Sequence, residues 1–148
     1  MQENYENEAE LVITETERNQ SVFIFRCKNT TINIKGKVNT ISVMECTKTN
    51  ILADSLVSSV DIIKSTGFAL QILHQIPTVL IDQCDGGVIY IPKESLNVEV
   101  FTTKTTALNI CIPDAGDDGD YAERPVPEQL KHTVKNGLLV SEIVEHSG

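Results

Sequence analysis

Apolar residues recur along this chain with a period of nineteen. Four starting positions, stepped by nineteen, give four rows of five residues; all twenty are apolar, although only 41% of the chain is hydrophobic. Seventeen of the twenty are Val or Ile, which favour strands. The rows are Val22, Ile41, Val60, Val79, Val98; Ile24, Val43, Ile62, Ile81, Val100; Ile32, Ile51, Leu70, Ile89, Leu108; and Ile34, Ala53, Ile72, Ile91, Ile110. A fixed period of this length indicates a repeat architecture in which each unit packs on the next.

Within each repeat the apolar residues form two pairs, such as Val22 with Ile24 and Ile32 with Ile34. A spacing of two puts both side chains on one face of a strand. Each repeat therefore contains two short strands separated by polar turns, and successive repeats stack these strands in parallel. The sequence predicts an all-β fold, a parallel β-helix with coils of about 19 residues over roughly 11–112.

A fifth row of small residues follows the same step and includes three of the four cysteines. Its members are Cys27, Cys46, Ser65, Cys84 and Thr103. We interpret them as inward-facing corner positions, where small apolar side chains fit. No Cys-x-x-Cys pair or nearby His accompanies them, and the acids of 113–128 lack the alternate spacing of a calcium loop. We expect no metal and no cofactor.

The two ends of the chain depart from the repeat. Residues 1–10 read as an acidic leader before a single domain over 11–148, and 11–18 as a partial coil with Ile13 one step before Ile32. After Ile112 comes a stretch rich in acids, Gly and Pro, which predicts a loop over 113–128. Asn-Gly at 136–137, between two β-rich runs, predicts a hairpin over 129–146 with arms near 129–135 and 138–145.

A two-stranded hairpin is marginally stable alone, so this one is expected to pack on its own last coil or on a second copy of the chain. We favour a homodimer in which each hairpin covers the other subunit, because the preceding loop gives the reach for an exchange. The hairpin residues expected to serve this contact are Leu130, Val134, Asn136, Gly137, Leu139, Val140, Ile143 and Val144.

Charge and motifs narrow the function classes. A net charge of −9 and a pI near 4.7 argue against binding to nucleic acid or anionic membrane. No run approaches the ~18 apolar residues of a membrane span, and the N-terminus has no apolar signal region, so we expect a cytoplasmic protein. No phosphate loop or nucleophile elbow is present, and the outward Asp61, Asp82, Asp85 and Glu99 share no row. We predict no enzyme.

The first coils are nevertheless locally basic. Arg26, Lys28, Lys35, Lys37 and Lys48 gather there, and Glu45 is the single acid between positions 18 and 53. Such a strip is typical of a docking surface for an acidic partner, although ordinary solvation of a sheet face gives the same pattern.

Three stretches resemble the C-terminal, actin-monomer-binding domain of the cyclase-associated proteins. They are "CKNTTINIKGKVNTISVMEC" (27–46), "GGVIYIPKESLNVEV" (86–100) and "RPVPEQLK" (124–131), and the likeness covers roughly 10–148. The resemblance implies a right-handed β-helix with the hairpin exchanged in a dimer. It also implies cytoskeleton-associated binding of monomeric actin, preferably in the ADP form, and faster replacement of ADP by ATP. The residues expected to contact actin are Lys35, Lys37, Asn39 and Lys48, then Lys28 and Lys64, with Pro125, Val126, Pro127, Glu128 and Gln129 as the family motif.

Other interpretations stay open. The chain could sequester actin monomers, or scaffold another protein, without exchange activity. The related β-helix of tubulin cofactor C activates GTPases with an arginine in a Gln-x-Arg-x-His setting, which none of Arg18, Arg26 and Arg124 shares. "LKHTV" (130–134) resembles the short element of thymosin-like actin binders, but the amphipathic helix that precedes that element is not predicted here. Members of the cyclase-associated family carry further N-terminal segments, so we expect either a short form or one piece of a longer protein.

Overall fold

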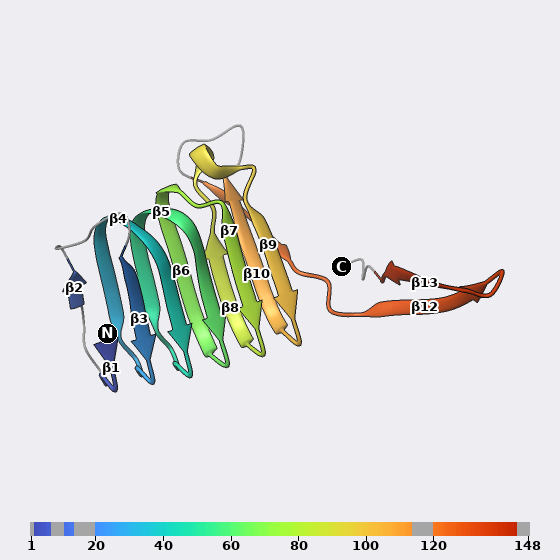
Figure 1. Ribbon diagram of the computed structural model, residues 1–148, viewed down its shortest axis with the longest axis horizontal. Coiled ribbons are helices and arrows are strands. Elements are labelled where there is room, and N and C mark those ends of the chain that lie inside the picture. The colour runs from blue at the N-terminus through green and yellow to red at the C-terminus, as the bar shows by residue number, and fades with distance from the viewer. Residues whose placement is uncertain (1, 7–10, 14–19, 114–119, 145–148) are drawn as a thin grey trace.

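The chain is a stack of parallel β-coils with a hairpin at its C-terminal end (Figure 1). A computed structural model describes residues 2–6, 11–13, 20–113 and 120–144. Its elements are β1 (Gln2–Glu3), β2 (Leu11–Ile13), β3 (Ser21–Phe25), β4 (Thr31–Met44), β5 (Asn50–Ile63), β6 (Thr66–Gln75), β7 (Thr78–Asp82), β8 (Asp85–Tyr90), the 3-10 helix η1 (Lys93–Ser95), β9 (Glu99–Thr103), β10 (Thr106–Pro113), β11 (Tyr121–Pro125), β12 (Leu130–Lys135) and β13 (Leu138–Ile143). The predicted parallel β-helix with a C-terminal hairpin is confirmed.

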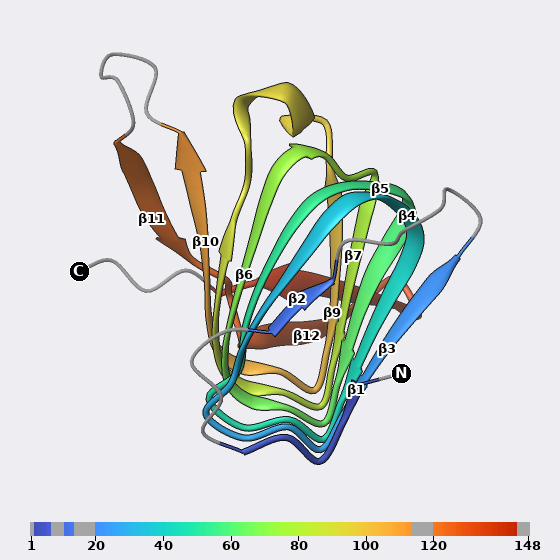
Figure 2. The same cartoon turned by 90° about the vertical axis from the view of Figure 1, so that its left-hand side faces the viewer.

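Each coil has two long sides, and β4 and β5 arch over from one side to the other (Figure 2). We call the side formed by β1, β3, the second halves of β4 and β5, β7 and β9 the front sheet. The back sheet comprises β2, the first halves of β4 and β5, β6, β8 and β10, with β11 at its edge. Within the coil stack every strand pair is parallel except β10 with β11.

The apolar rows stack on one another inside the coils. On the back sheet Ile32 pairs with Ile51, Ile51 with Leu70, and Leu70 with Ile89, and each is at most 2% exposed. A step of nineteen thus places each side chain on the equivalent side chain of the next coil. β-branched residues suit these positions because their stiff side chains pack well on a pleated surface.

The last coil breaks the nineteen-residue step, and the predicted rows fail there. Val79 pairs with Val100 and Ile81 with Thr102, so Val98 lies outside its expected row. On the back sheet Ile89 pairs with Ile110 rather than with Leu108. The shift is two residues in each case.

The cause is a longer bend between β8 and β9, which holds η1. Ser95, at the end of η1, is buried; its Oγ accepts from Ile76 N–H at 3.0 Å and donates to the His74 carbonyl at 3.0 Å. The two extra residues are taken up in this turn and leave the strand pairing intact. Counting in steps of nineteen could not detect this insertion, because apolar and polar residues still alternate on both sides of it.

The cysteine row occupies an inward corner, as predicted. Cys27, Cys46, Ser65 and Cys84 are all buried, and the fifth member is Thr105 in place of Thr103, again because of the two-residue shift. The row is flanked by two columns of residues with φ between 47° and 75°, a region that side-chain-bearing residues rarely adopt. These columns are Arg26, Glu45, Lys64, Gln83, Lys104 and Asn29, Lys48, Gly67, Gly86, Ala107.

The N-terminal residues join the first coil. Gln2 pairs with Ile24, and Glu6 forms a bridge with Lys28, so residues 2–6 are part of the stack rather than a leader outside it. In β2, Leu11 pairs with Ile32; the predicted alignment of Ile13 with Ile32 was wrong by two residues. The remainder of the expected partial coil, 14–19, lies outside the described residues.

The C-terminal end is covered on one side only. β11, in a segment predicted to be a loop, pairs antiparallel with β10 and closes the back sheet. The rings of Tyr90 and Tyr121 pack edge to face there, 5.4 Å apart. On the front sheet, β9 pairs with β7 alone among the described strands, so its outer edge keeps unpaired backbone groups.

The hairpin β12–β13 projects away from the coils (Figure 1). Asn136 and Gly137 both have positive φ, 52° and 76°, as a two-residue turn of this kind requires, and the predicted hairpin is confirmed.

One packing contact in the core yields a stability prediction. A Cβ on Gly87 would overlap Cζ of the buried Phe68. We expect Gly87→Ala to cost about 1–3 kcal/mol in free energy of unfolding, since a well-packed core resists added volume. In urea unfolding, the same change made in a Phe68→Leu background should cost less, because the ring is gone. A Gly87→Ala protein as stable as the parent would contradict this packing.

Candidate protein-binding surfaces

The predicted basic strip is two separate groups of lysines. Lys35 and Lys37 lie midway along β4, where the strand arches between the sheets (Figure 2), on either side of Gly36. The Gly36 N–H donates to Asp54 Oδ2 at 2.8 Å, which fixes this bend. Lys28 and Lys48 instead lie in the corner segments at the other end of the coil. All four are exposed, but they do not form one continuous strip.

The other two basic-region candidates have different surroundings. Asn39 is partly buried; its Oδ1 accepts from Ser58 Oγ at 2.7 Å, and its N–H donates to the Gln20 carbonyl, so it also links coils. Lys64 is exposed in the corner column that follows the front sheet. In the same column Arg26 Nε lies 3.1 Å from Glu45 Oε2, an exposed pair of small energetic value.

The motif begins at Pro125, the last residue of β11, and its residues 126–129 form the linker between the coils and the hairpin. The Val126 N–H donates to the Leu108 carbonyl at 2.9 Å, and Val126 packs partly buried against the core. Glu128 Oε2 accepts from the Ala107 N–H at 3.1 Å. Pro125, Pro127 and Gln129 are exposed beside an open groove of about 700 Å³. Val126 and Glu128 therefore anchor the linker to the last coil.

One face of the hairpin is largely apolar, with the hydrogen-bonded His132 and Ser141 between its two apolar pairs. Leu130 pairs with Ile143 and Val134 with Leu139, and pairs at this spacing point to the same side. These four side chains are 55–73% exposed. The opposite side carries Lys131, Thr133, Lys135, Leu138, Val140 and Glu142. At the base of the hairpin, the Val144 N–H donates to the Gln129 carbonyl at 3.0 Å.

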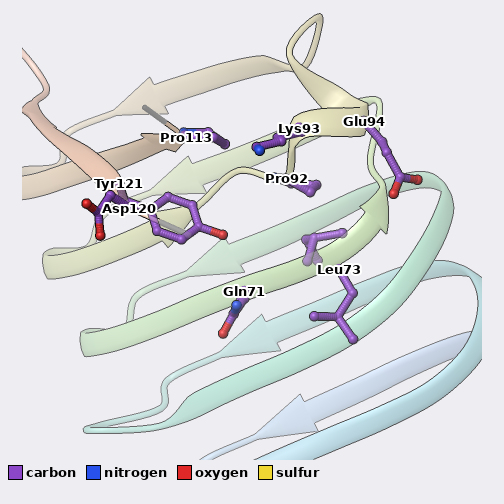
Figure 3. A pocket seen from close by; sticks show the side chains of 9 residues that line it. Gln71, Leu73, Pro92, Lys93, Glu94, Pro113, Asp120 and Tyr121 are labelled. Carbon is purple, nitrogen blue, oxygen red and sulfur yellow. The ribbon is translucent and has the colours of Figure 1, made fainter. Parts of the chain in front are cut away.

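A smaller pocket of about 300 Å³ lies on the back sheet between η1 and β11 (Figure 3). Leu73, Pro92 and Tyr121 contribute its apolar lining, while Glu94 and Asp120 stand at opposite ends of it. Glu94 is engaged with His74, whose Nδ1 lies 3.2 Å from Glu94 Oε1. The Glu94 and Asp120 carboxylates lie at opposite ends of the pocket and therefore do not form an acid–base pair.

The cysteines have the properties of core residues. The Cys27 N–H donates to Cys46 Sγ at 3.4 Å, and burial raises the pKa of the Cys46 thiol from its ordinary 9.0 to about 11. Burial also raises the pKa of Cys84 and Cys111. Within the described residues no three His, Cys, Asp or Glu side chains are grouped to hold a metal ion.

The described part of the chain contains no helix with the length and apolar character needed to cross a membrane.

The described part of the chain is therefore a parallel β-helix domain with an apolar hairpin extending from its C-terminal end. The family model for the C-terminal region of adenylate-cyclase-associated (CAP) proteins matches residues 1–146. The chain belongs to this family.

The relatives agree with this assignment. The adenylyl cyclase-associated protein of Schizosaccharomyces pombe is 50% identical over 145 residues, which are 97% of this chain and 26% of that protein. Human adenylyl cyclase-associated protein 1 is 40% identical over 146 residues, 99% of this chain and 30% of that protein. The crystal structure of cyclase-associated protein from Cryptosporidium parvum superposes with a TM-score of 0.85 at 31% identity, covering 95% of this chain and 87% of that one. The chain thus spans less than a third of these two curated relatives.

Sequence reasoning missed one surface feature that a signal in the repeat could have revealed. Large apolar residues also stand at outward positions of the front sheet, between the inward pairs. Phe23, Leu80 and Phe101 are 40–51% exposed there.

The raised pKa of Cys46 yields a pH prediction. An unfolded thiol ionises near 9.0 and the folded one near 11, so the unfolded state loses its proton first as pH rises. Stability should therefore fall by up to about 3 kcal/mol between pH 9 and pH 11 on account of this group. Urea unfolding across that range should show a steeper loss for the parent than for Cys46→Ala. Parallel pH profiles for the two proteins would contradict it.

Proposed function

We propose that this domain binds monomeric actin and promotes the exchange of bound ADP for ATP, and so regulates filament turnover in the cytoplasm. The observation that carries this proposal is family membership over residues 1–146, together with the sequence motifs that resemble the actin-binding domain. The activity needs no chemical step on the domain. It requires tighter binding to an actin state that releases nucleotide readily, which is a coupling between two binding equilibria.

The working unit of the proposal is a homodimer with exchanged hairpins. Support comes from two incomplete surfaces at one end of the chain: the apolar hairpin face of Leu130, Val134, Leu139 and Ile143, and the unpaired outer edge of β9. A two-stranded hairpin that packs against no other protein surface is only marginally stable. A strand of a second copy laid along β9 would satisfy its backbone groups and bury those side chains.

The proposed actin contacts are those inferred from the sequence. Lys35, Lys37 and Lys48 are exposed, and Lys28 and Lys64 extend the basic surface. Because these lysines lie at both ends of the coil, one partner would have to span the face between them. In the linker, Val126 and Glu128 already anchor the hairpin, so Pro125, Pro127 and Gln129 are the members exposed to a partner.

The dimer prediction compares two adjacent leucines on opposite sides of the hairpin. Leu139 is 71% exposed on the apolar face, and Leu138 is 70% exposed on the other. Light scattering at micromolar concentration should give twice the 16.3 kDa chain mass for the parent and for Leu138→Lys. Leu139→Lys should dissociate to monomer, because it buries an unpaired charge in the interface. A monomeric parent, or equal dissociation of both variants, would contradict the exchanged hairpin.

The exchange activity is tested by the release of a fluorescent nucleotide from ADP-loaded actin monomers. The parent should accelerate release. Lys35→Ala/Lys37→Ala should need roughly five- to thirtyfold more protein for the same effect, as expected for a loss of 1–2 kcal/mol of binding. Lys93→Ala/Lys131→Ala removes the same charge elsewhere and should behave like the parent.

Two other outcomes separate the alternatives. A complex with actin but no acceleration would make the domain a monomer-sequestering protein. Absence of a complex would contradict the proposed function altogether.

A further inference from the structure

The turn that joins β12 to β13 consists of Asn136 and Gly137 and lies at the end of the hairpin farthest from the coils (Figure 1). Both residues are exposed, and both have positive φ, 52° and 76°. A Cβ added to Gly137 would meet no atom within 4 Å, so the space around this peptide is open. Loop tips built from small polar residues are the parts of a fold most open to covalent attack.

An Asn followed by Gly can react with its own backbone. The Gly137 nitrogen, after losing its proton, attacks Cγ of Asn136. The new N–Cγ bond closes a five-membered succinimide, and the side-chain nitrogen leaves as ammonia with that proton. Water then opens the ring at Cγ to give Asp, or at the main-chain carbonyl to give isoaspartate. The reaction consumes only water and needs no oxidant.

Two features of the turn favour this reaction. Gly137 has no side chain to crowd its attacking nitrogen. In a four-residue turn the closing hydrogen bond joins the first residue to the last, here Lys135 to Leu138, and leaves the third residue's N–H unengaged. Among the hydrogen bonds of the described residues, none comes from the Gly137 N–H. The nitrogen is therefore open to solvent base and free to approach Cγ.

A second asparagine, Asn29, provides a matched comparison. It is also exposed and has a positive φ of 49°, but the residue that follows it is Thr30. Thr30 is β-branched and 1% exposed, and its Oγ1 donates to the Lys28 carbonyl at 2.9 Å, so its backbone nitrogen is crowded and held in place. Asn136 is the single Asn of the sequence that precedes a Gly. The reaction is therefore expected at one position.

The two products differ in their effect on the hairpin. Asp-Gly is favoured in a two-residue turn of this type, as Asn-Gly is, so the Asp product keeps the turn. Isoaspartate carries its side-chain carbon into the main chain and lengthens the loop by one atom. Loop length fixes the register of a hairpin, and the pairs Lys135 with Leu138 and Val134 with Leu139 follow the turn directly. Isoaspartate therefore disturbs the apolar face that this register assembles.

We propose that Asn136 is a deamidation site at which isoaspartate forms spontaneously, and that the lengthened turn weakens the exchange of hairpins between two copies. The modified site has the chemistry that an enzyme methylating isoaspartyl carboxylates recognises. The modification is argued from the turn alone, whereas its effect on the dimer rests on the proposed function.

The site is tested by incubating the parent in warm, mildly alkaline buffer and mapping its peptides by mass spectrometry at intervals. Isoaspartate is measured as methyl groups transferred from S-adenosylmethionine by an isoaspartyl methyltransferase. Deamidation at Asn136 should be at least about tenfold faster than at Asn29, which corresponds to about 1.4 kcal/mol in activation free energy. Asn136→Gly, whose Gly-Gly pair also suits the turn, should lose most of the methyl acceptance. An Asn136 amide that survives as long as that of Asn29 would overturn the assignment.

The effect on the dimer is measured by size-exclusion chromatography with light scattering on the same samples. Chains with isoaspartate at 136 should collect in the monomer fraction as the incubation proceeds, while Asn136→Gly should show the same dimer fraction before and after it. Asn136→Asp adds the charge without lengthening the loop, and it should dissociate less than the isoaspartate chains. Isoaspartate chains that remain in dimers would overturn the effect on assembly. If the fresh parent is already monomeric, the proposed dimer fails, while the peptide map still decides whether Asn136 is modified.

Discussion

The structure depends on one constraint, which is that every coil must place its Val and Ile side chains directly on those of its neighbours. Parallel strands of adjacent coils are about 4.8 Å apart, so a side chain has its equivalent as its nearest neighbour. Ile32, Ile51, Leu70 and Ile89 follow one another in this way. Pairing then fixes the turns: residues on both sides of the cysteine row are held at positive φ, where most side chains are disfavoured, because shifting this corner would shift every row.

The same constraint creates a problem at the ends of the stack. An interior coil is covered above and below, whereas the last one has a free backbone edge and exposed apolar side chains. β11 and Val126 cover the back sheet's end, but β9 keeps an open edge beside an apolar hairpin. The proposed dimer would therefore cover the end of the stack that the last coil leaves open.

The sequence predicted the features that repeat. Complete rows of Val and Ile, and an Asn-Gly turn between β-rich arms, were enough for the coils and the hairpin. It did not predict β11, because "YAERP" (121–125) has little strand character and forms a strand by pairing with the free edge of β10. The rows also failed in the last coil, where η1 absorbs two residues without disturbing the apolar alternation. For the proposed binding residues, charge alone suggested one basic strip, while the path of β4 separates Lys35 and Lys37 from Lys28 and Lys48.

We propose that a two-copy β-helix, completed by exchanged hairpins, binds one actin monomer per copy. Sedimentation velocity of the domain with a small excess of ADP-actin monomers tests it most directly, because the mass of the complex reports both associations at once. We expect a complex of two domains with two actin monomers. A complex of one domain with one actin, or separate sedimentation of the two proteins, would contradict it.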